Sequence, residues 1–248
     1  MRTFSLLPAL SMLLVLCLAS CKSTFLLKEN FSGDSVGSDP IKNIPGDPAG
    51  DSVSYTSVLS PRLTVQSSTV TTGQKALVFS EASIPGATSF NQWLSFKGIV
   101  SDYSQPIWFY WTAKQRASQS DILIDIMGVQ GLWVTRFKIR HNGQLVRIID
   151  YATEQTVDVL GTFDPQQVHT IIISLQPTAR KYNITVFGLR ESNSATRTNL
   201  NVLTQPNPSG PVFSFEKPSI NFRYLDGGFS AASAYILEGV YITRKKPN

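Results

Sequence analysis

Paired carboxylates are the first chemistry to look for in this chain, because two of them about 5 Å apart can cleave a glycosidic bond. The sequence contains six glutamates, and no two are close along the chain: Glu29, Glu81, Glu154, Glu191, Glu216 and Glu238. Asp121 and Asp125 share one face of a predicted strand, but the rise of a strand separates them by about 13 Å. A catalytic pair would therefore have to be assembled from separate strands.

Histidine and cysteine add little catalytic or metal-binding chemistry. His141 precedes a predicted turn, and His169 lies inside a predicted strand, where a packed or hydrogen-bonded histidine is more common than a catalyst. The only cysteines, Cys17 and Cys21, lie close together at the start of the chain, so no Cys/His metal site is predicted. We therefore predict no catalytic residue, no cofactor and no bound metal.

An aromatic run supplies one candidate binding surface. In Ile107-Trp108-Phe109-Tyr110-Trp111, strand alternation places Trp108 and Tyr110 on one face and the other three residues on the opposite face. Exposed Trp and Tyr side chains can stack on the apolar faces of sugar rings. Burial of both faces is the favoured interpretation, because sandwich strands often have both faces partly covered. A stacking pair formed by Trp108 and Tyr110 is the alternative.

A row of basic residues supplies the other candidate surface. Arg136, Lys138 and Arg140 alternate on one face of a predicted strand, and the expected hairpin register places Lys138 opposite Arg147. Like charges directly opposed destabilise a sheet, so something should offset them. Aspartates of the predicted strand 121–127 could do so, and this interpretation is favoured. An anionic ligand is the alternative.

Strand-forming segments follow one another from about residue 53 to the end of the chain. They are rich in Val, Ile, Thr and aromatic residues, alternate with period two, and are separated by Gly, Pro, Asn or Ser. The predicted strands are 62–66, 74–80, 90–100, 106–114, 121–127, 131–141, 144–150, 155–160, 168–176, 181–189, 211–215, 219–225 and 233–244. Many short strands without helices predict an all-β, antiparallel two-sheet sandwich.

One hairpin can be placed in register from its turn. Asn142-Gly143 predicts a two-residue loop, because both positions accept a positive φ. Ile139 would then face Val146, and Phe137 would face Ile148. In this register the buried face of the first strand would consist of Trp133, Thr135, Phe137 and Ile139.

A second hairpin carries a family resemblance. Val168-His169-Thr170-Ile171-Ile172-Ile173-Ser174-Leu175, a short turn, and Tyr182-Asn183-Ile184-Thr185-Val186-Phe187-Gly188 resemble the central hairpin of concanavalin/laminin-G-like jelly rolls. The segment 234–243 is similar to the last strand of that superfamily. The resemblance implies two curved sheets with a concave face on which relatives often bind glycans. Retaining glycosidases of this fold carry a Glu-x-Asp-x-x-Glu strand, and the present chain has no such motif.

The first residues predict export and lipidation. Arg2, the apolar run 6–18 and Leu18-Ala19-Ser20-Cys21 resemble the signal peptide and lipobox of bacterial lipoproteins, which implies removal of residues 1–20 and acylation of Cys21. Residues 21–52, rich in Gly and Pro, would then form a tether, and residues 53–248 the sandwich domain. Lys22 in place of an aspartate favours an outer-membrane or surface location.

The sequence as a whole favours a binding protein over an enzyme. Its formal net charge is +5, and the dispersed basic residues give a poor argument for a nucleic-acid partner. We expect a non-catalytic lipoprotein of the cell envelope that binds a glycan or an anionic polymer, with Trp108, Tyr110, Arg136, Lys138, Arg140 and Arg147 as candidate contacts. A glycoside-active enzyme with carboxylates from separate strands and a structural or adhesion lipoprotein are the alternatives.

Overall fold

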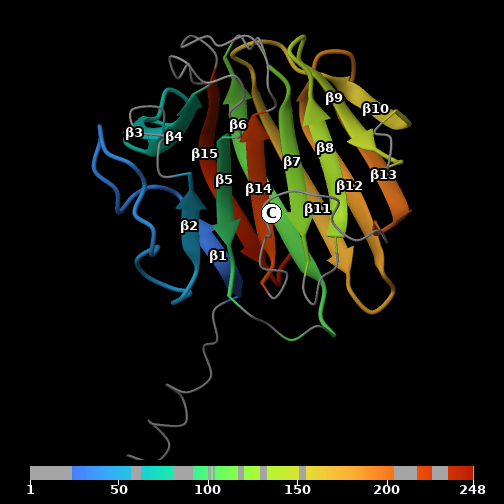
Figure 1. Cartoon of the computed structure of the whole chain (residues 1–248), viewed down its shortest axis with the longest axis horizontal. Helices are drawn as coiled ribbons and strands as arrows, with labels where there is room; N and C mark the ends of the chain where they lie inside the picture. Colours follow the sequence, from blue (N-terminus) through green and yellow to red (C-terminus); the bar gives the residue numbers. More distant parts are fainter. Residues whose placement is uncertain are drawn as a thin grey trace, which may run out of the picture.

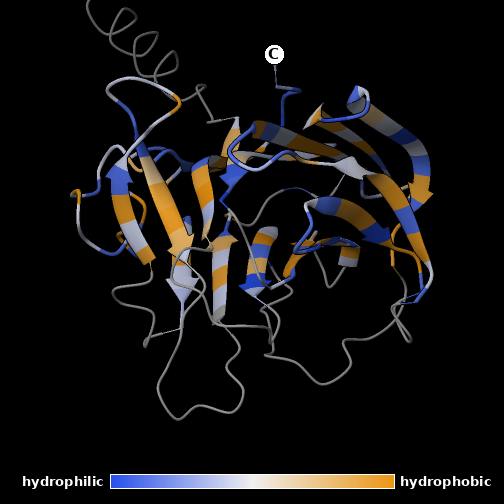
Figure 2. Ribbon diagram, turned by 90° about the horizontal axis from the view of Figure 1, so that it is seen from above, coloured by the Kyte–Doolittle hydropathy of each residue, from blue (hydrophilic) through white to orange (hydrophobic). Residues whose placement is uncertain are grey.

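Two antiparallel β-sheets pack face to face in a computed structural model of the chain, which confirms the predicted all-β sandwich (Figure 1; Figure 2). The structure describes residues 24–56, 63–80, 92–99, 102, 104–116, 120–128, 133–150, 155–203, 217–224 and 234–247. No helix in these ranges is long and apolar enough to cross a membrane. The predicted signal peptide and Cys21 lie outside the described residues.

The larger sheet, sheet A, has eight strands in the order β13-β12-β11-β6-β15-β4-β3, with β1 also paired to β15. Its strands are β1 (Phe25–Glu29), β3 (Leu63–Ser67), β4 (Lys75–Ser80), β6 (Ile107–Gln115), β11 (Val168–Gln176), β12 (Lys181–Leu189), β13 (Asn193–Asn201) and β15 (Ala234–Thr243). Sheet B has seven strands in the order β10-β9-β8-β7-β14-β5-β2. These are β2 (Ser52–Tyr55), β5 (Gln92–Lys97), β7 (Ile122–Met127), β8 (Trp133–Ile139), β9 (Gln144–Ile148), β10 (Val157–Thr162) and β14 (Ser219–Tyr224).

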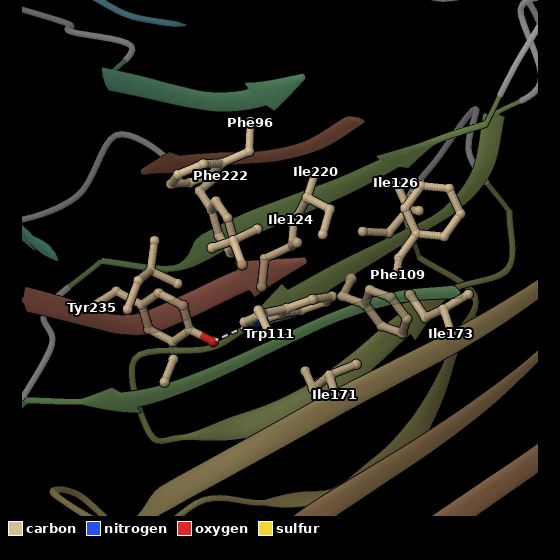
Figure 3. Close-up of a cluster of buried hydrophobic side chains, with 14 of the residues drawn as sticks. Phe96, Phe109, Trp111, Ile124, Ile126, Ile171, Ile173, Ile220, Phe222 and Tyr235 are labelled. Carbon is tan, nitrogen blue, oxygen red and sulfur yellow. Dashed lines mark hydrogen bonds between the residues drawn. The ribbon is translucent and has the colours of Figure 1, made fainter. Parts of the chain in front are cut away.

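The core fills the space between the sheets with the inward side chains of both (Figure 3). Trp111 of sheet A meets Phe222 of sheet B edge to face, with ring centroids 5.8 Å apart. Phe96 meets the same Phe222 ring in a similar edge-to-face contact at 6.0 Å. The alternation of hydrophobic and hydrophilic residues along the strands follows from this packing, because only every second side chain points inward (Figure 2).

The central hairpin is present as the resemblance implied. Ile171 lies opposite Val186, Ile173 opposite Ile184, and Leu175 opposite Tyr182. Most of the other predicted strands are also present, although the predicted strand 211–215 lies outside the described residues. The sequence did not predict β13, whose exposed and polar side chains show no alternation that signals a strand.

The N-terminal segment differs from its predicted role as a tether. From residue 24 onward it is packed on the sandwich, with β1 paired to β15 and β2 paired to β5. Leu26, Leu27 and Phe31 are buried in the main core. The Gly and Pro content of this segment suggested a tether. Burial of a few apolar side chains attaches the segment to the domain instead. The outer limits of the domain stay a prediction.

The Asn142-Gly143 hairpin is shifted by one residue from the predicted register. Lys138 lies opposite Val146, and Ile139 lies opposite Leu145. The loop has three residues because Arg140 and Gln144 close it, with the Arg140 N–H donating to the Gln144 carbonyl at 2.9 Å. Of the three loop residues, His141, Asn142 and Gly143, only Gly143 has a positive φ, which is 82°. The predicted like-charge pair of Lys138 and Arg147 is therefore wrong.

The predicted buried face of β8 is also corrected at its start. Thr135, Phe137 and Ile139 are buried on the core side, but a register shift next to Met127 turns Trp133 to the outer face. There the Trp133 ring contacts the Arg136 guanidinium, 4.7 Å from the ring centroid. A bulge of this kind inserts one residue and reverses the alternation that follows.

Replacing Gly143 by alanine should destabilise the fold more than the same change at Gly73. Both glycines have a φ near +80°, where a Cβ costs about 1–2 kcal/mol. At Gly143 the added Cβ would also lie 2.5 Å from the Phe163 carbonyl oxygen, whereas at Gly73 it would meet nothing within 4 Å. Denaturant unfolding of Gly143→Ala and Gly73→Ala measures the difference. Equal losses would contradict the described packing of this turn.

Candidate functional site

The six predicted contact residues do not form one site, because the fold distributes them over four places. Trp108 and Tyr110 of β6 lie on the outer face of sheet A, since their neighbours Ile107, Phe109 and Trp111 fill the core. Arg136 and Lys138 of β8 lie on the outer face of sheet B, on the opposite side of the molecule. Arg140 is at the hairpin end, and Arg147 points to the core side.

Arg136 is engaged in a buried ion pair. Its Nε and Nη2 donate to the two carboxylate oxygens of Asp125 at 2.5 and 2.8 Å, and both side chains are only 6% exposed. The two residues are direct cross-strand partners on β7 and β8. The sequence favoured aspartates of strand 121–127 as the groups that neutralise Arg136, Lys138 and Arg140. For Arg136 this prediction is correct, because Asp125 is its partner.

Arg147 and Arg140 also have partners within the chain. Arg147 and Arg197 both donate to the Asp158 carboxylate, and Arg197 reaches it from the opposite sheet. Arg140 donates to the Gln144 side chain at 2.7 Å. The basic side chains predicted as one contact surface therefore serve separate internal interactions.

Trp108, Tyr110 and Tyr241 form what we call the aromatic platform, on the outer face of sheet A. Tyr110 stacks on Tyr241 of β15, with ring centroids 4.8 Å apart and planes 15° from parallel. Trp108 lies on the same face of β6, two residues before Tyr110, and all three side chains are half-buried. Burial and the nearby Tyr241 hydroxyl raise the pKa of Tyr110 to about 12, so it is neutral at physiological pH.

Polar side chains continue the same face across the next two strands. Trp108 lies opposite Ser174 of β11, and Ser174 lies opposite Asn183 of β12. The Asn183 amide donates to the Ser174 hydroxyl at 3.1 Å. Because adjacent strands are about 4.8 Å apart, Asn183 stands about 10 Å from Trp108 along this row. An aromatic surface therefore borders directly on amide and hydroxyl groups.

Gly239 makes room for the platform. A Cβ at this position would lie 2.7 Å from the ring edge and the hydroxyl of Tyr241. The Tyr241 ring therefore lies across the backbone of Gly239. The ring of Phe25 of β1 also contacts Tyr241, with ring centroids 6.2 Å apart. Tyr241 was not predicted as a site residue. Alternation in the predicted last strand nevertheless places its side chain on the outer face, because Val240 and Ile242 on either side of it point to the core. Ser174 and Asn183 were also not predicted as site residues. Strand alternation in the predicted hairpin could have placed both side chains on this outer face.

Several carboxylates in the described part of the chain accept hydrogen bonds that support the fold. Near the N-terminal segment, Glu29, Asp34 and Asp51 accept hydrogen bonds from the backbone N–H groups of Phe31, Ile41 and Lys28. Burial, with smaller contributions from Asp34 and Asp51, raises the pKa of Glu29 to about 7. Among the described residues no group of three or more His, Cys, Asp or Glu side chains could hold a metal ion.

His169 is a buried core residue. Its ring stacks on Phe163 at 3.8 Å, and its Nε2 lies 2.8 Å from the Tyr235 hydroxyl. That hydroxyl accepts a hydrogen bond from the Trp111 indole at 3.0 Å, which Figure 3 shows. Since that hydroxyl has one proton of its own to donate, Nε2 is the acceptor. Burial lowers the pKa of His169 to about 3, which keeps the ring neutral.

Similarity to known proteins is confined to structure. No protein-family model and no curated protein matches the chain. Among solved structures, the chain is similar to the catalytic domain of a GH131 β-glucanase from Podospora anserina, with a TM-score of 0.56 and 12% identity over 91% of this chain and 98% of that one. The catalytic domain of a glycoside hydrolase family 131 protein from Coprinopsis cinerea gives a TM-score of 0.57 and 12% identity, over 91% and 96%.

A third match is partial. A sialidase is similar over 74% of this chain, with a TM-score of 0.45 and 11% identity, and the present chain spans 17% of its length. The two GH131 matches show a shared jelly-roll sandwich that covers nearly the whole of each catalytic domain. At 12% identity this likeness concerns the fold alone.

Acidification should destabilise the protein through His169. The unfolded chain takes up a proton near the ordinary pKa of 6.5, whereas the folded chain does so only near pH 3. Stability is therefore present above pH 6.5 and falls as the pH drops below it, by up to about 1.4 kcal/mol per pH unit. Glu29, whose pKa is raised to about 7, takes up a proton in the folded state over the same range and acts in the opposite direction, so the effect of His169 is read as the difference between wild type and His169→Gln. In unfolding measured between pH 7 and 4.5, His169→Gln should remove a pH-dependent loss of stability that the wild type has. His141→Gln, at an exposed histidine, is the control and should keep it.

Proposed function

We propose that this protein is a non-catalytic, lipid-anchored protein of the bacterial cell envelope that binds a carbohydrate through the outer face of sheet A. The aromatic platform carries the proposal, because Trp108, Tyr110 and Tyr241 form a half-buried stacking surface bordered by Ser174 and Asn183. Sugar rings have an apolar face that stacks on aromatic rings and hydroxyls that pair with amide and hydroxyl groups.

This face shows no pair of carboxylates in the described part of the chain. None of the outward side chains of β6, β11 and β12 is a carboxylate: Trp108, Tyr110, Thr112 and Lys114, then Val168, Thr170, Ile172, Ser174 and Gln176, then Lys181, Asn183, Thr185 and Phe187. On the other side of the platform, Lys28 of β1 lies opposite Tyr241, and Glu238 of β15 accepts a hydrogen bond from the Ser68 hydroxyl. Glycoside hydrolysis ordinarily needs two carboxyl groups across the scissile bond. The described part of this face therefore favours binding over hydrolysis.

The fold supports the proposal only in a general way. Two of the similar structures are catalytic domains of proteins described as a β-glucanase and a glycoside hydrolase. A jelly-roll sandwich can also present one sheet face to an extended polysaccharide chain. Function depends on the residues placed on the fold, so the platform and not the likeness bears the argument.

Lipidation at Cys21 would hold the domain close to the membrane. Phe25, the first residue of β1, follows Cys21 by four residues, and a fully extended chain of that length spans at most about 14 Å. Phe25 packs beside Tyr241, so the platform lies near the anchored end of the domain. A ligand in the envelope would then be held next to the membrane surface.

Removing one ring of the platform should weaken sugar binding without unfolding the protein. Full-length protein is screened on a glycan array, and the affinity of each bound glycan is measured for Trp108→Ala, Tyr241→Ala and the control Phe187→Ala. Phe187 is an exposed aromatic residue on the same sheet face, away from the platform. We expect the platform variants to lose about tenfold in affinity, which corresponds to about 1.4 kcal/mol for the lost stacking contact.

Two outcomes would overturn this assignment. Binding that is unchanged in both platform variants would exclude the platform as the site. Platform variants that bind glycans normally but lose binding to lipid vesicles would identify the platform as a membrane contact, because Trp and Tyr also favour membrane interfaces.

Replacing Cys21 by serine should release the protein from the membrane fraction. Cys17→Ser is the matched control, because this cysteine lies inside the predicted signal peptide and should leave anchoring unchanged. Fractionation of cells and incorporation of labelled palmitate measure the two properties. Palmitate labelling that persists in Cys21→Ser would contradict the predicted lipidation site.

A further inference from the structure

The end of sheet A at which the chain enters the domain is rich in cations. Register aligns Phe25 of β1, Thr243 of β15 and Trp108 of β6 in one row, which continues onto β11. Basic residues lie beyond this row, at the end of the sheet that contains the start of β1 and the turn between β11 and β12 (Figure 1). We call this group the basic end, and it consists of Arg180, Lys181, Arg244, Lys245 and Lys246.

The side chains of the basic end reach the solvent. Arg180, Lys245 and Lys246 are exposed, and Lys181 and Arg244 are partly exposed. Lys181 opens β12 and Arg244 follows β15, and the sheet order β12-β11-β6-β15 separates them by three strand spacings, about 14 Å. Cations spread along an edge of this width fit an extended anionic surface better than one small anion.

Acidic groups do not balance these cations in the described part of this end of sheet A. The one acidic residue described there is Asp102, whose backbone carbonyl accepts a hydrogen bond from the Arg244 guanidinium. The opposite end of the same sheet differs, because Arg190 pairs with Asp164 at 2.5 Å and Glu191 follows it directly. Positive charge is therefore concentrated at one end of the sheet.

The predicted lipid anchor would leave the domain at the same end. The Thr24 carbonyl accepts hydrogen bonds from the Arg244 N–H at 2.8 Å and from the Thr243 hydroxyl at 2.9 Å. Cys21 precedes Thr24 by three residues, which span at most about 11 Å. Lys22, next to Cys21, adds a further cation in the sequence. Acylation of Cys21, the part of the proposed function on which this step rests, would therefore bring the basic end to the lipid headgroups.

We propose that the basic end docks on anionic lipid headgroups and so orients the anchored domain. A single tether fixes the distance of a domain from the membrane but not its orientation. Each Lys or Arg close to an anionic lipid surface favours the docked orientation by about fivefold. With this end of the sheet on the membrane, the strands of sheet A run away from the surface. The outer face of sheet A, with the aromatic platform, then stays open to a ligand.

Energy transfer from the domain to a vesicle surface tests this orientation. Protein purified from the membrane fraction is reconstituted in vesicles of phosphatidylcholine alone, or of an equal mixture of phosphatidylcholine and phosphatidylglycerol, with acceptor dyes on the headgroups. The donor dye is attached at Ala179→Cys, in the turn of the basic end, or at Ser192→Cys, in the exposed turn between β12 and β13 at the opposite end.

Phosphatidylglycerol should raise the energy transfer from position 179 and not from position 192, and high salt should reverse the rise because it screens exposed charges. The ratio of docked to undocked protein should fall about 30-fold in Lys245→Gln/Lys246→Gln, which removes two cations. Arg116→Gln/Arg190→Gln removes two cations at the opposite end of the sheet and should change the ratio by less than about twofold. Equal transfer from position 179 in both kinds of vesicle, or equal losses in the two double variants, would overturn the proposal.

Failure of the lipid anchor is seen separately from failure of the basic end. Protein that does not stay with the phosphatidylcholine vesicles would contradict the proposed lipidation of Cys21. The basic end is then tested by sedimentation of the same protein with the phosphatidylglycerol vesicles, and Lys245→Gln/Lys246→Gln should weaken that binding by about 30-fold. Equal sedimentation of the wild type and this double variant would overturn the proposal.

Discussion

Burial of one face of each strand between the two sheets is the constraint on which the rest of this structure depends. The inward side chains of β6, such as Trp111, and those of β14, such as Phe222, pack against each other and exclude water. Strand geometry then sends the intervening residues outward. The outward side chains are therefore where the chain can vary its chemistry, and the aromatic platform lies among them.

Several of the polar groups that the fold buries are paired in ways that specify register. The Asp125–Arg136 pair joins β7 to β8, and the His169–Tyr235–Trp111 contacts join β11, β15 and β6 within the core. Buried charges and hydroxyls are costly unless they are paired, so a slip of either sheet would be penalised. This requirement explains why several basic residues that resemble ligand contacts in the sequence serve the fold instead.

Sequence patterns predicted the architecture better than its details. Alternation identified the central hairpin and the two faces of β6, because Ile171, Ile173 and Phe109 must all reach the core. It could not identify β13, an exposed edge strand whose side chains face water. The hairpin at Gly143 was placed one residue out of register, because two-residue and three-residue loops share the same turn residues.

The sequence by itself determined which residues alternate, and therefore that Trp108 and Tyr110 share a face and that Arg136 and Lys138 share another. Local periodicity contains this information because it arises within single strands. Only the tertiary structure decided which strands are neighbours: it placed Tyr241 on Tyr110, paired Arg136 with Asp125, and aligned Ser54, Ser95 and Asn221 across three strands. These strands are far apart along the chain, and contacts between them depend on how both sheets close around one core.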